Sequence, residues 1–212
     1  MSRLFIATFA SEKYQRQLAE VQLQNPDLEA VWRRKIRWVK PERLHMTWVF
    51  LGTVSNDLIQ PISDMMSNLI TNELGREPDK APMKIIFDKA EVWPDQRKPR
   101  QIVLRPSDVD NRILSLARTV RTGLLEFYFD QLQKEEFRSF KPHITLLRVE
   151  RRQETQKFPR TPGIKLKPSD IVELDDALPV VLNLDKIVLV ESHMGKNSSY
   201  QVLHEVPMAS KR

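Results

Sequence analysis

Residues 44–51 (LHMTWVFL) and 142–147 (PHITLL) repeat one pattern, a histidine followed two residues later by a threonine inside an apolar run. The chain has four histidines, and the other two, His193 and His204, are not followed by threonine at that offset. A pattern shared by two of four histidines is strong enough to count as a motif. We call it the His-x-Thr motif.

Successive side chains of a β-strand point to opposite faces, so the histidine and threonine of each motif share one face. The first pair is His45 with Thr47, and the second is His143 with Thr145. A single histidine on an apolar strand is more often a satisfied structural group than a catalyst, and threonine is common in strands. The duplication favours a functional interpretation for both pairs.

The length and composition predict a protein that folds around its own core. A chain of 212 residues with 41% hydrophobic residues and no flexible linker is expected to form one domain over residues 1–212. It has no cysteine, which excludes disulfides and thiolate nucleophiles and is typical of a reducing compartment. Residues 1–10 read as a short first strand and predict neither a membrane span nor a signal peptide. We expect a cytoplasmic protein with no membrane association.

The net charge of +6 favours a phosphate-bearing ligand, although a solvated basic surface is the alternative. Basic residues cluster at 33–37 (RRKIR), 97–100 (RKPR) and 148–152 (RVERR). Only the last cluster lies beside a His-x-Thr motif. For the other two, solubility and function are equally expected from the sequence.

Periodicity predicts an α+β fold in which a helix and then a His-x-Thr strand occur in each half of the chain. Residues 155–184 are rich in proline and charge and are expected to form a flap or a loose surface segment. The other expected elements are a strand at 3–9, a helix capped by Ser11, a helix at 55–74, strands at 83–93 and 101–105, a helix capped by Ser107, and a hairpin of 185–192 with 200–206.

Two histidines and two threonines on matching faces suit proton transfer at a phosphodiester. A neutral imidazole can accept a proton from water while an imidazolium protonates the leaving oxygen, each step contributing about 10²- to 10⁴-fold. Threonine hydroxyls can donate hydrogen bonds to the non-bridging oxygens. The sequence contains no His-Glu-x-x-His motif and no glycine-rich phosphate loop, so we expect no metal and no cofactor. It leaves open which histidine is the acid.

Four stretches, in order, resemble landmarks of the two-histidine phosphoesterase superfamily, and in particular of the RNA 2′,3′-cyclic phosphodiesterases, formerly called 2′-5′ RNA ligases. They are residues 3–7 (RLFIA), 44–52 (LHMTWVFLG), 141–148 (KPHITLLR), and 190–192 (VES) with Tyr200. The resemblance covers nearly the whole chain. It implies a bilobal α+β fold of two pseudo-symmetric lobes, each with an antiparallel sheet lining a central cleft and helices outside.

The resemblance also implies the roles of the motif residues. His45 is expected to protonate the leaving 3′ oxygen, His143 to activate water, and Thr47 and Thr145 to hold the phosphate oxygens. The substrate would be an RNA end with a 2′,3′-cyclic phosphate, such as a tRNA fragment, and the product a 2′-phosphate end. Reversible 2′-5′ ligation and a monomeric state are further expectations.

Phe50 and Arg148 each lie five residues after a motif histidine, and we hypothesise that they flank the terminal base. Strict alternation would place both on the opposite face, so each strand must twist, bulge or end before them. Arg148 matches an arginine that the family uses for ligand contact, whereas Phe50 is equally expected in the core. Tyr200 is a further candidate for base binding.

Three departures from the family pattern leave the substrate open. Trp48 replaces a small aliphatic residue, the 155–184 segment is long, and the usual Gly-Pro before Tyr200 is missing. The alternatives are a phosphodiesterase for small cyclic phosphates or 2′-5′ oligonucleotides, and a non-catalytic protein that binds RNA ends.

Overall fold

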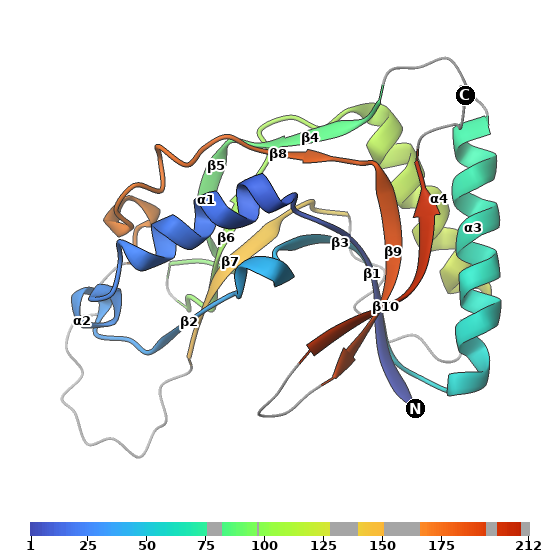
Figure 1. Cartoon of the computed structure of the whole chain (residues 1–212), viewed down its shortest axis with the longest axis horizontal. Helices are drawn as coiled ribbons and strands as arrows, with labels where there is room; N and C mark the ends of the chain where they lie inside the picture. Colours follow the sequence, from blue (N-terminus) through green and yellow to red (C-terminus); the bar gives the residue numbers. More distant parts are fainter. Residues whose placement is uncertain (76–81, 97, 128–139, 151–165, 194–198, 209–212) are drawn as a thin grey trace.

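The computed structural model describes residues 1–75, 82–96, 98–127, 140–150, 166–193 and 199–208. Helices and antiparallel strands occur in mixed order along the chain, in agreement with the α+β class expected from the sequence (Figure 1). The elements are β1 (Ser2–Phe9), α1 (Glu12–Leu23), α2 (Leu28–Trp32), β2 (Ile36–Trp38), β3 (His45–Val54), α3 (Ile59–Gly75), β4 (Lys84–Phe87), β5 (Lys89–Trp93), β6 (Gln101–Arg105), α4 (Asn111–Phe127), β7 (Ile144–Val149), β8 (Val180–Asn183), β9 (Lys186–His193) and β10 (Ser199–Pro207).

Most of these strands form one antiparallel sheet of order β10-β9-β1-β3-β7-β6-β5, with β2 paired to β7 as well. The half-sheets β10-β9-β1-β3 and β2-β7-β6-β5 are joined in the described part of the chain by the pairing of Met46 with Ile144. The implied fold has two separate sheets, whereas here the sheets are continuous at this one point. The reason is that β3 and β7 run in opposite directions and overlap only where each begins.

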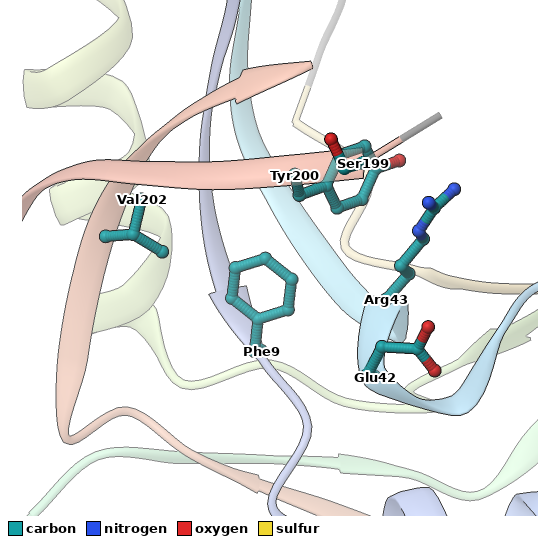
Figure 2. Close-up of a pocket in the computed structure, with 6 residues that line it drawn as sticks. All are labelled: Phe9, Glu42, Arg43, Ser199, Tyr200 and Val202. Carbon is teal, nitrogen blue, oxygen red and sulfur yellow. The ribbon is translucent and has the colours of Figure 1, made fainter. Parts of the chain in front are cut away.

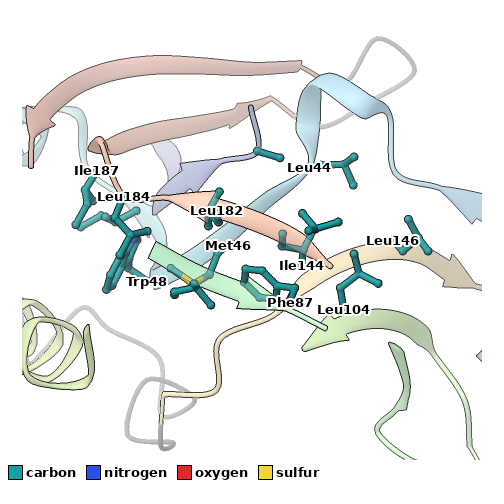
Figure 3. Close-up of a cluster of buried hydrophobic side chains, with 14 of the residues drawn as sticks. Leu44, Met46, Trp48, Phe87, Leu104, Ile144, Leu146, Leu182, Leu184 and Ile187 are labelled. Carbon is teal, nitrogen blue, oxygen red and sulfur yellow. The ribbon is translucent and has the colours of Figure 1, made fainter. Parts of the chain in front are cut away.

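One face of the sheet carries the main hydrophobic core. The alternate residues Met46, Trp48, Ile144 and Leu146 are fully buried there, beneath the small two-stranded sheet of β4 and β8 (Figure 3). Helix α1 lies toward one end of the molecule, and α3 and α4 lie together toward the other (Figure 1). The apolar residues that recur at helical spacing in α1 and α4 are buried: Leu18, Val21, Ile113, Ala117, Val120 and Leu124.

The opposite face of the first half-sheet carries a second, smaller apolar cluster. Its buried members come from β1 and β9, and three half-buried aromatic residues pack against them. Successive side chains of a strand point to opposite faces, so the β1 and β9 residues of this cluster alternate along the strand with those that are buried in the main core. The cluster consists of Phe5, Ala7, Val188 and Val190 with Phe9, Phe50 and Tyr200.

Residues 166–184 are not a loose segment, so that prediction is wrong for the part that the structure describes. Their apolar residues enter the main core, and β8 pairs with β4. Residues 155–165 of the predicted flap lie outside the described residues. The buried side chains of the segment are Leu166, Ile171, Leu174, Ala177, Val180, Leu182 and Leu184.

Two element boundaries also differ from prediction. The strand expected over 83–93 is divided at Asp88, because β4 pairs with β8 while β5 pairs with β6. The helix expected after Ser107 begins at Asn111, because the Asp110 carboxylate accepts the backbone N–H of Arg112 at 2.8 Å and so caps the helix. The predicted first strand and closing hairpin are confirmed as β1 and as β9 with β10.

No helix in the described part of the chain combines the length and the apolar character needed to cross a bilayer.

Candidate active site

The two His-x-Thr motifs lie side by side where the half-sheets meet. In the antiparallel register set by Met46 and Ile144, His45 lies beside Thr145 and Thr47 beside His143. All four motif residues are half-buried, while the residues between them are buried on the core face. The structure therefore brings the two copies together on one face, a juxtaposition that strand alternation alone did not establish.

Both histidine rings are held by the same local contact. The Nδ1 atom of His45 lies 2.6 Å from the carbonyl oxygen of Arg43, and that of His143 lies 2.8 Å from the carbonyl oxygen of Lys141. Each carbonyl belongs to the residue two positions earlier, so the contact is repeated together with the motif.

This contact determines which ring nitrogen is available. A carbonyl oxygen only accepts hydrogen bonds, so Nδ1 carries the hydrogen and donates it. The neutral ring of His45 or His143 therefore presents the lone pair of Nε2, and the protonated ring presents an N–H donor at the same place. Either ring can act as acid or base through Nε2.

A β-bulge follows each motif and repeats at the same position. On β3 the register with β1 shifts so that Trp48 is the extra residue, and on β7 the register with β6 shifts so that Leu146 is the extra residue. A bulge reverses the alternation beyond it. Phe50 and Arg148 are thereby returned to the face of the motif residues, as their predicted role requires.

The bulge on β3 is stabilised from the core side. The Trp48 carbonyl accepts a hydrogen bond from the guanidinium of Arg121 on α4 at 3.0 Å, and the Trp48 indole N–H donates to the Thr8 hydroxyl at 3.0 Å. The Trp48 ring stacks on Phe140 with centroids 5.6 Å apart. Trp48, the first departure from the family pattern, therefore faces the core and does not contact the motif face.

His45 lies among aromatic rings of the smaller cluster. Its ring centroid is 5.0 Å from that of Phe5, 5.5 Å from Phe9 and 5.6 Å from Tyr200, the last in an edge-to-face arrangement. The Arg43 guanidinium lies over the Tyr200 ring, 5.2 Å from its centroid. A pocket of about 370 Å³ opens next to these rings (Figure 2), lined by Phe9, Glu42, Arg43, Ser199, Tyr200 and Val202.

His143 has a more polar environment. The ring centroids of His143 and Trp93 are 4.6 Å apart. The Arg105 guanidinium lies over the Trp93 ring, 5.5 Å from its centroid. Arg105 is also 3.8 Å from the carboxylate of Glu91, which accepts the Trp93 indole N–H at 3.1 Å. Three aromatic rings therefore surround His45, whereas His143 has one aromatic neighbour, Trp93, with Arg105 beyond it.

Both histidines favour the neutral form in the ligand-free protein. The pKa of His45 is lowered to about 4, chiefly by burial and also by the charges of His143 and Arg148, while the hydrogen bond to the Arg43 carbonyl acts to raise it. Burial also lowers the pKa of His143, against the hydrogen bond to the Lys141 carbonyl and together with the charge of Arg105. An anion bound between the rings would raise both values.

The two histidines outside the motifs have structural contacts. The His204 ring is hydrogen-bonded to the Ser67 hydroxyl of α3 at 2.7 Å, and His193 lies 3.6 Å from the Glu191 carboxylate. Within the described residues, no three histidine or acidic side chains are close enough together to hold a metal ion.

Sequence reasoning missed several residues around the site. Phe9 and Arg43 beside His45, and Trp93 and Arg105 beside His143, belong to neighbouring strands or to the turn before β3. The signal available for Phe9 was the alternation of β1, where Phe5, Ala7 and Phe9 share a face. Trp93 and Arg105 required the register of β5 with β6 and of β6 with β7.

Comparisons with known proteins relate the chain to phosphoesterases. Residues 10–103 match the family model described as LigT-like phosphoesterase. The chain is 26% identical over 152 residues to the RNA 2′,3′-cyclic phosphodiesterase of Aquifex aeolicus, covering 69% of this chain and 70% of that protein. It is 33% identical over 113 residues to the protein of the same name from Bacillus subtilis, covering 53% of this chain and 55% of that one.

Solved structures share the fold across the whole chain. A Thermus thermophilus protein has a TM-score of 0.67 at 22% identity, covering 99% of this chain and all of that one. E. coli LigT in its ligand-free form has a TM-score of 0.66 at 20% identity, covering 99% of this chain and 98% of that one. At these identities the structures support the fold.

The matched family model, which covers residues 10–103, and the curated relatives support an assignment of the chain to the LigT-like phosphoesterases, a two-histidine family.

Proposed function

We propose that this protein, as one domain over residues 1–212, hydrolyses the 2′,3′-cyclic phosphate at the end of an RNA chain and leaves a 2′-phosphate. The observation that carries the proposal is the meeting of two His-x-Thr motifs in antiparallel register, with both rings held through Nδ1. The relatives named RNA 2′,3′-cyclic phosphodiesterase support the same reaction. The chemistry uses side chains alone and needs no metal or cofactor.

In the proposed mechanism, Nε2 of neutral His143 takes a proton from water. The oxygen of that water bonds to phosphorus while the bond from phosphorus to the 3′ oxygen breaks, and Nε2–H of protonated His45 gives its proton to the 3′ oxygen. Thr47 and Thr145 donate hydrogen bonds to the non-bridging oxygens, where negative charge increases in the transition state. Exchange of protons with solvent then restores both rings.

The surroundings of the two rings support this division of roles. The Arg105 cation beside His143 disfavours a second positive charge on that ring, which suits a base. The residue paired with His45 on β1 is Phe9, and the cation that lowers the pKa of His45 is Arg148 of the other half-sheet, whose charge a bound phosphate would offset. The acid form of His45 is stabilised by the negative phosphate once substrate is bound.

The pocket next to His45 is the proposed site of the terminal nucleoside. Tyr200 and Phe9 offer aromatic surfaces for stacking, and Phe50 supports them from within the smaller cluster. Arg148, returned to this face by its bulge, is proposed to contact the substrate from the second half-sheet. Cytoplasmic RNA ends, including tRNA fragments, are the proposed substrates of a monomeric protein. The same groups would catalyse the reverse joining of a cyclic end to a 5′-hydroxyl.

The test is release of a 2′-phosphate from an oligonucleotide with a 2′,3′-cyclic phosphate, measured in EDTA. We expect turnover by the wild type and a loss of about 10²- to 10⁴-fold in kcat for His45→Ala and for His143→Ala. His193→Ala is the matched control, since that ring lies outside both motifs. Equal product from the wild type and both motif variants would refute the mechanism.

A further inference from the structure

One arginine from each of three basic clusters that are far apart in the sequence lines a common pocket in the structure. Arg37 lies on β2, Arg100 directly precedes β6, and Arg148 lies on β7, and all three line one pocket of about 330 Å³. Strand β7 lies between β2 and β6, so the central arginine has a neighbour on each side. The remaining lining residues are Gln101, Val149 and Glu150.

The arrangement places like charges next to each other. Arg37 and Arg148 are paired residues of adjacent antiparallel strands, which puts their side chains on the same face. Like charges in this position destabilise a sheet, and Glu150 is the single carboxylate that lines the pocket. None of the three guanidinium groups forms an ion pair within the described part of the chain. A bound anion would relieve the repulsion.

The arginine pocket shares strand β7 with the second His-x-Thr motif. Arg148 lies three residues after Thr145 on β7, about 7–10 Å away at the usual rise of a strand with a bulge. The bulge at Leu146 turns it to the motif face, and its charge contributes to the lowered pKa of His45. An anion held by these arginines would therefore lie close to a phosphate bound between the two motifs.

We propose that Arg37, Arg100 and Arg148 form a subsite for the phosphate on the 5′ side of the terminal nucleotide, so that the protein prefers polynucleotide ends to cyclic mononucleosides. This inference rests on the proposed function and adds the length of the substrate. A 2′,3′-cyclic phosphate ends the chain, so the strand continues only on the 5′ side. The subsite is suited to the phosphate backbone of the RNA and not to its bases, because cations outnumber the other polar groups in its lining and no aromatic residue lines it.

Arginine suits this role for a geometric reason. Its guanidinium edge presents N–H donors in a fork that matches two phosphate oxygens. The base contact proposed for Arg148 would use the flat face of the same group, so the two contacts are compatible. Arg37 and Arg100 are the residues that this inference adds to the site.

The test compares two substrates that differ by one phosphate and one nucleoside, adenosine 2′,3′-cyclic phosphate and the dinucleotide ApA ending in a 2′,3′-cyclic phosphate. We expect Arg37→Gln and Arg100→Gln each to lower kcat/KM for the dinucleotide by about 10-fold, as expected for loss of a charged hydrogen bond. The change for the mononucleoside should stay within about 2-fold. Arg118→Gln, an exposed arginine on α4, is the matched control and should leave the ratio of the two values unchanged.

Binding provides a readout independent of turnover. A fluorescently labelled oligonucleotide ending in a 2′-phosphate should bind Arg37→Gln and Arg100→Gln more weakly than wild type, with the slope of log K against log salt shallower by about 0.7 for each lost phosphate contact. An unchanged substrate ratio together with an unchanged salt slope would overturn the subsite. If wild type turns over neither substrate yet binding weakens in both variants, the proposed function fails and the subsite stands.

Discussion

The two half-sheets hold their histidines in the same way and surround them differently. His45 and His143 each donate from Nδ1 to the carbonyl two residues earlier, and each motif is followed by a bulge at the same position. On β1 the residue paired with His45 is Phe9. In the register of β6 with β7, the corresponding position beside His143 is Arg105.

The carbonyl contact that both rings share orients Nε2 of each ring. The neighbouring side chains, which differ between the two rings, influence whether the ring is protonated. A repeated backbone contact can make two rings equally able to move a proton, but only a difference in neighbours can make one an acid and the other a base. On the paired strands that difference lies at Phe9 and Arg105, while the charges of Arg148 and His143 also lower the pKa of His45. The experiments below separate the two histidines by the step that each performs.

The largest expected effect separates the acid from the base by changing the leaving group. With a 4-nitrophenyl phosphodiester, whose leaving group departs without a proton, His45→Ala should recover most of the 10²- to 10⁴-fold that it loses on the cyclic phosphate. His143→Ala should lose about as much on both substrates, because water must still be activated. The measurement is kcat/KM for both variants on both substrates. Recovery by His143→Ala instead of His45→Ala would exchange the roles.

A second effect concerns stability, and His45 should dominate it. The pKa of His45 is about 4 in the folded protein, against an ordinary value of 6.5 that applies to the unfolded chain. Between pH 4 and pH 6.5 the unfolded chain therefore binds one more proton than the folded protein. The free energy of unfolding should therefore fall as pH falls from about 6.5 to 4, by at most about 3 kcal/mol from this group. Urea denaturation at both pH values measures it. His45→Asn should lose that part of the pH dependence, and a variant that keeps all of it would contradict the assignment.

Replacement of the threonines should have a smaller effect that is similar on the two halves. Thr47→Val and Thr145→Val each remove one hydroxyl donor to the phosphate oxygens, and we expect kcat to fall by about 10- to 100-fold in each variant. Thr53→Val, at an exposed position of β3, is the control. A normal kcat with a raised KM would show that the hydroxyl binds the ground state and the transition state equally.

The smallest expected effect is a shift of the pH profile. The rate should be bell-shaped in pH, with both limbs belonging to the coupled pair of rings. Arg105→Gln removes a positive charge near His143, so the pKa of His143 should rise and the acidic limb of kcat/KM should move to higher pH. Arg105→Lys, which keeps the charge, should leave the limb in place. A shift of equal size in both variants would indicate a structural role for Arg105.

Local pattern in the sequence was sufficient to predict the faces of the site. Strand alternation correctly separated His45 and Thr47 from Met46, and the same reasoning required an irregularity before Phe50 and Arg148, which the two bulges supply. These predictions hold because they depend on neighbouring residues alone. The roles of the individual side chains remain proposals.

Features that depend on which strands pair, and in which register, could not be predicted from the sequence. The pairing of β4 with β8 joins distant segments, and it draws into the core a stretch that its prolines and charges marked as loose. Likewise, Arg37 and Arg100 became distinctive only once β2, β6 and β7 were placed beside one another. In the cluster at 148–152, the sequence placed Arg148 beside a His-x-Thr motif, but it did not indicate that Arg37 and Arg100 lie next to it.

The pairing of Met46 with Ile144 has a consequence for how sequences of this kind can diverge. The separation of the two reacting rings is set by main-chain pairing between adjacent strands, about 4.8 Å apart, and by main-chain carbonyls that orient each ring. Main-chain geometry places few demands on side-chain identity, so substitution elsewhere can proceed far without changing that separation. A TM-score of 0.67 at 22% identity to the Thermus thermophilus protein is what such tolerance predicts.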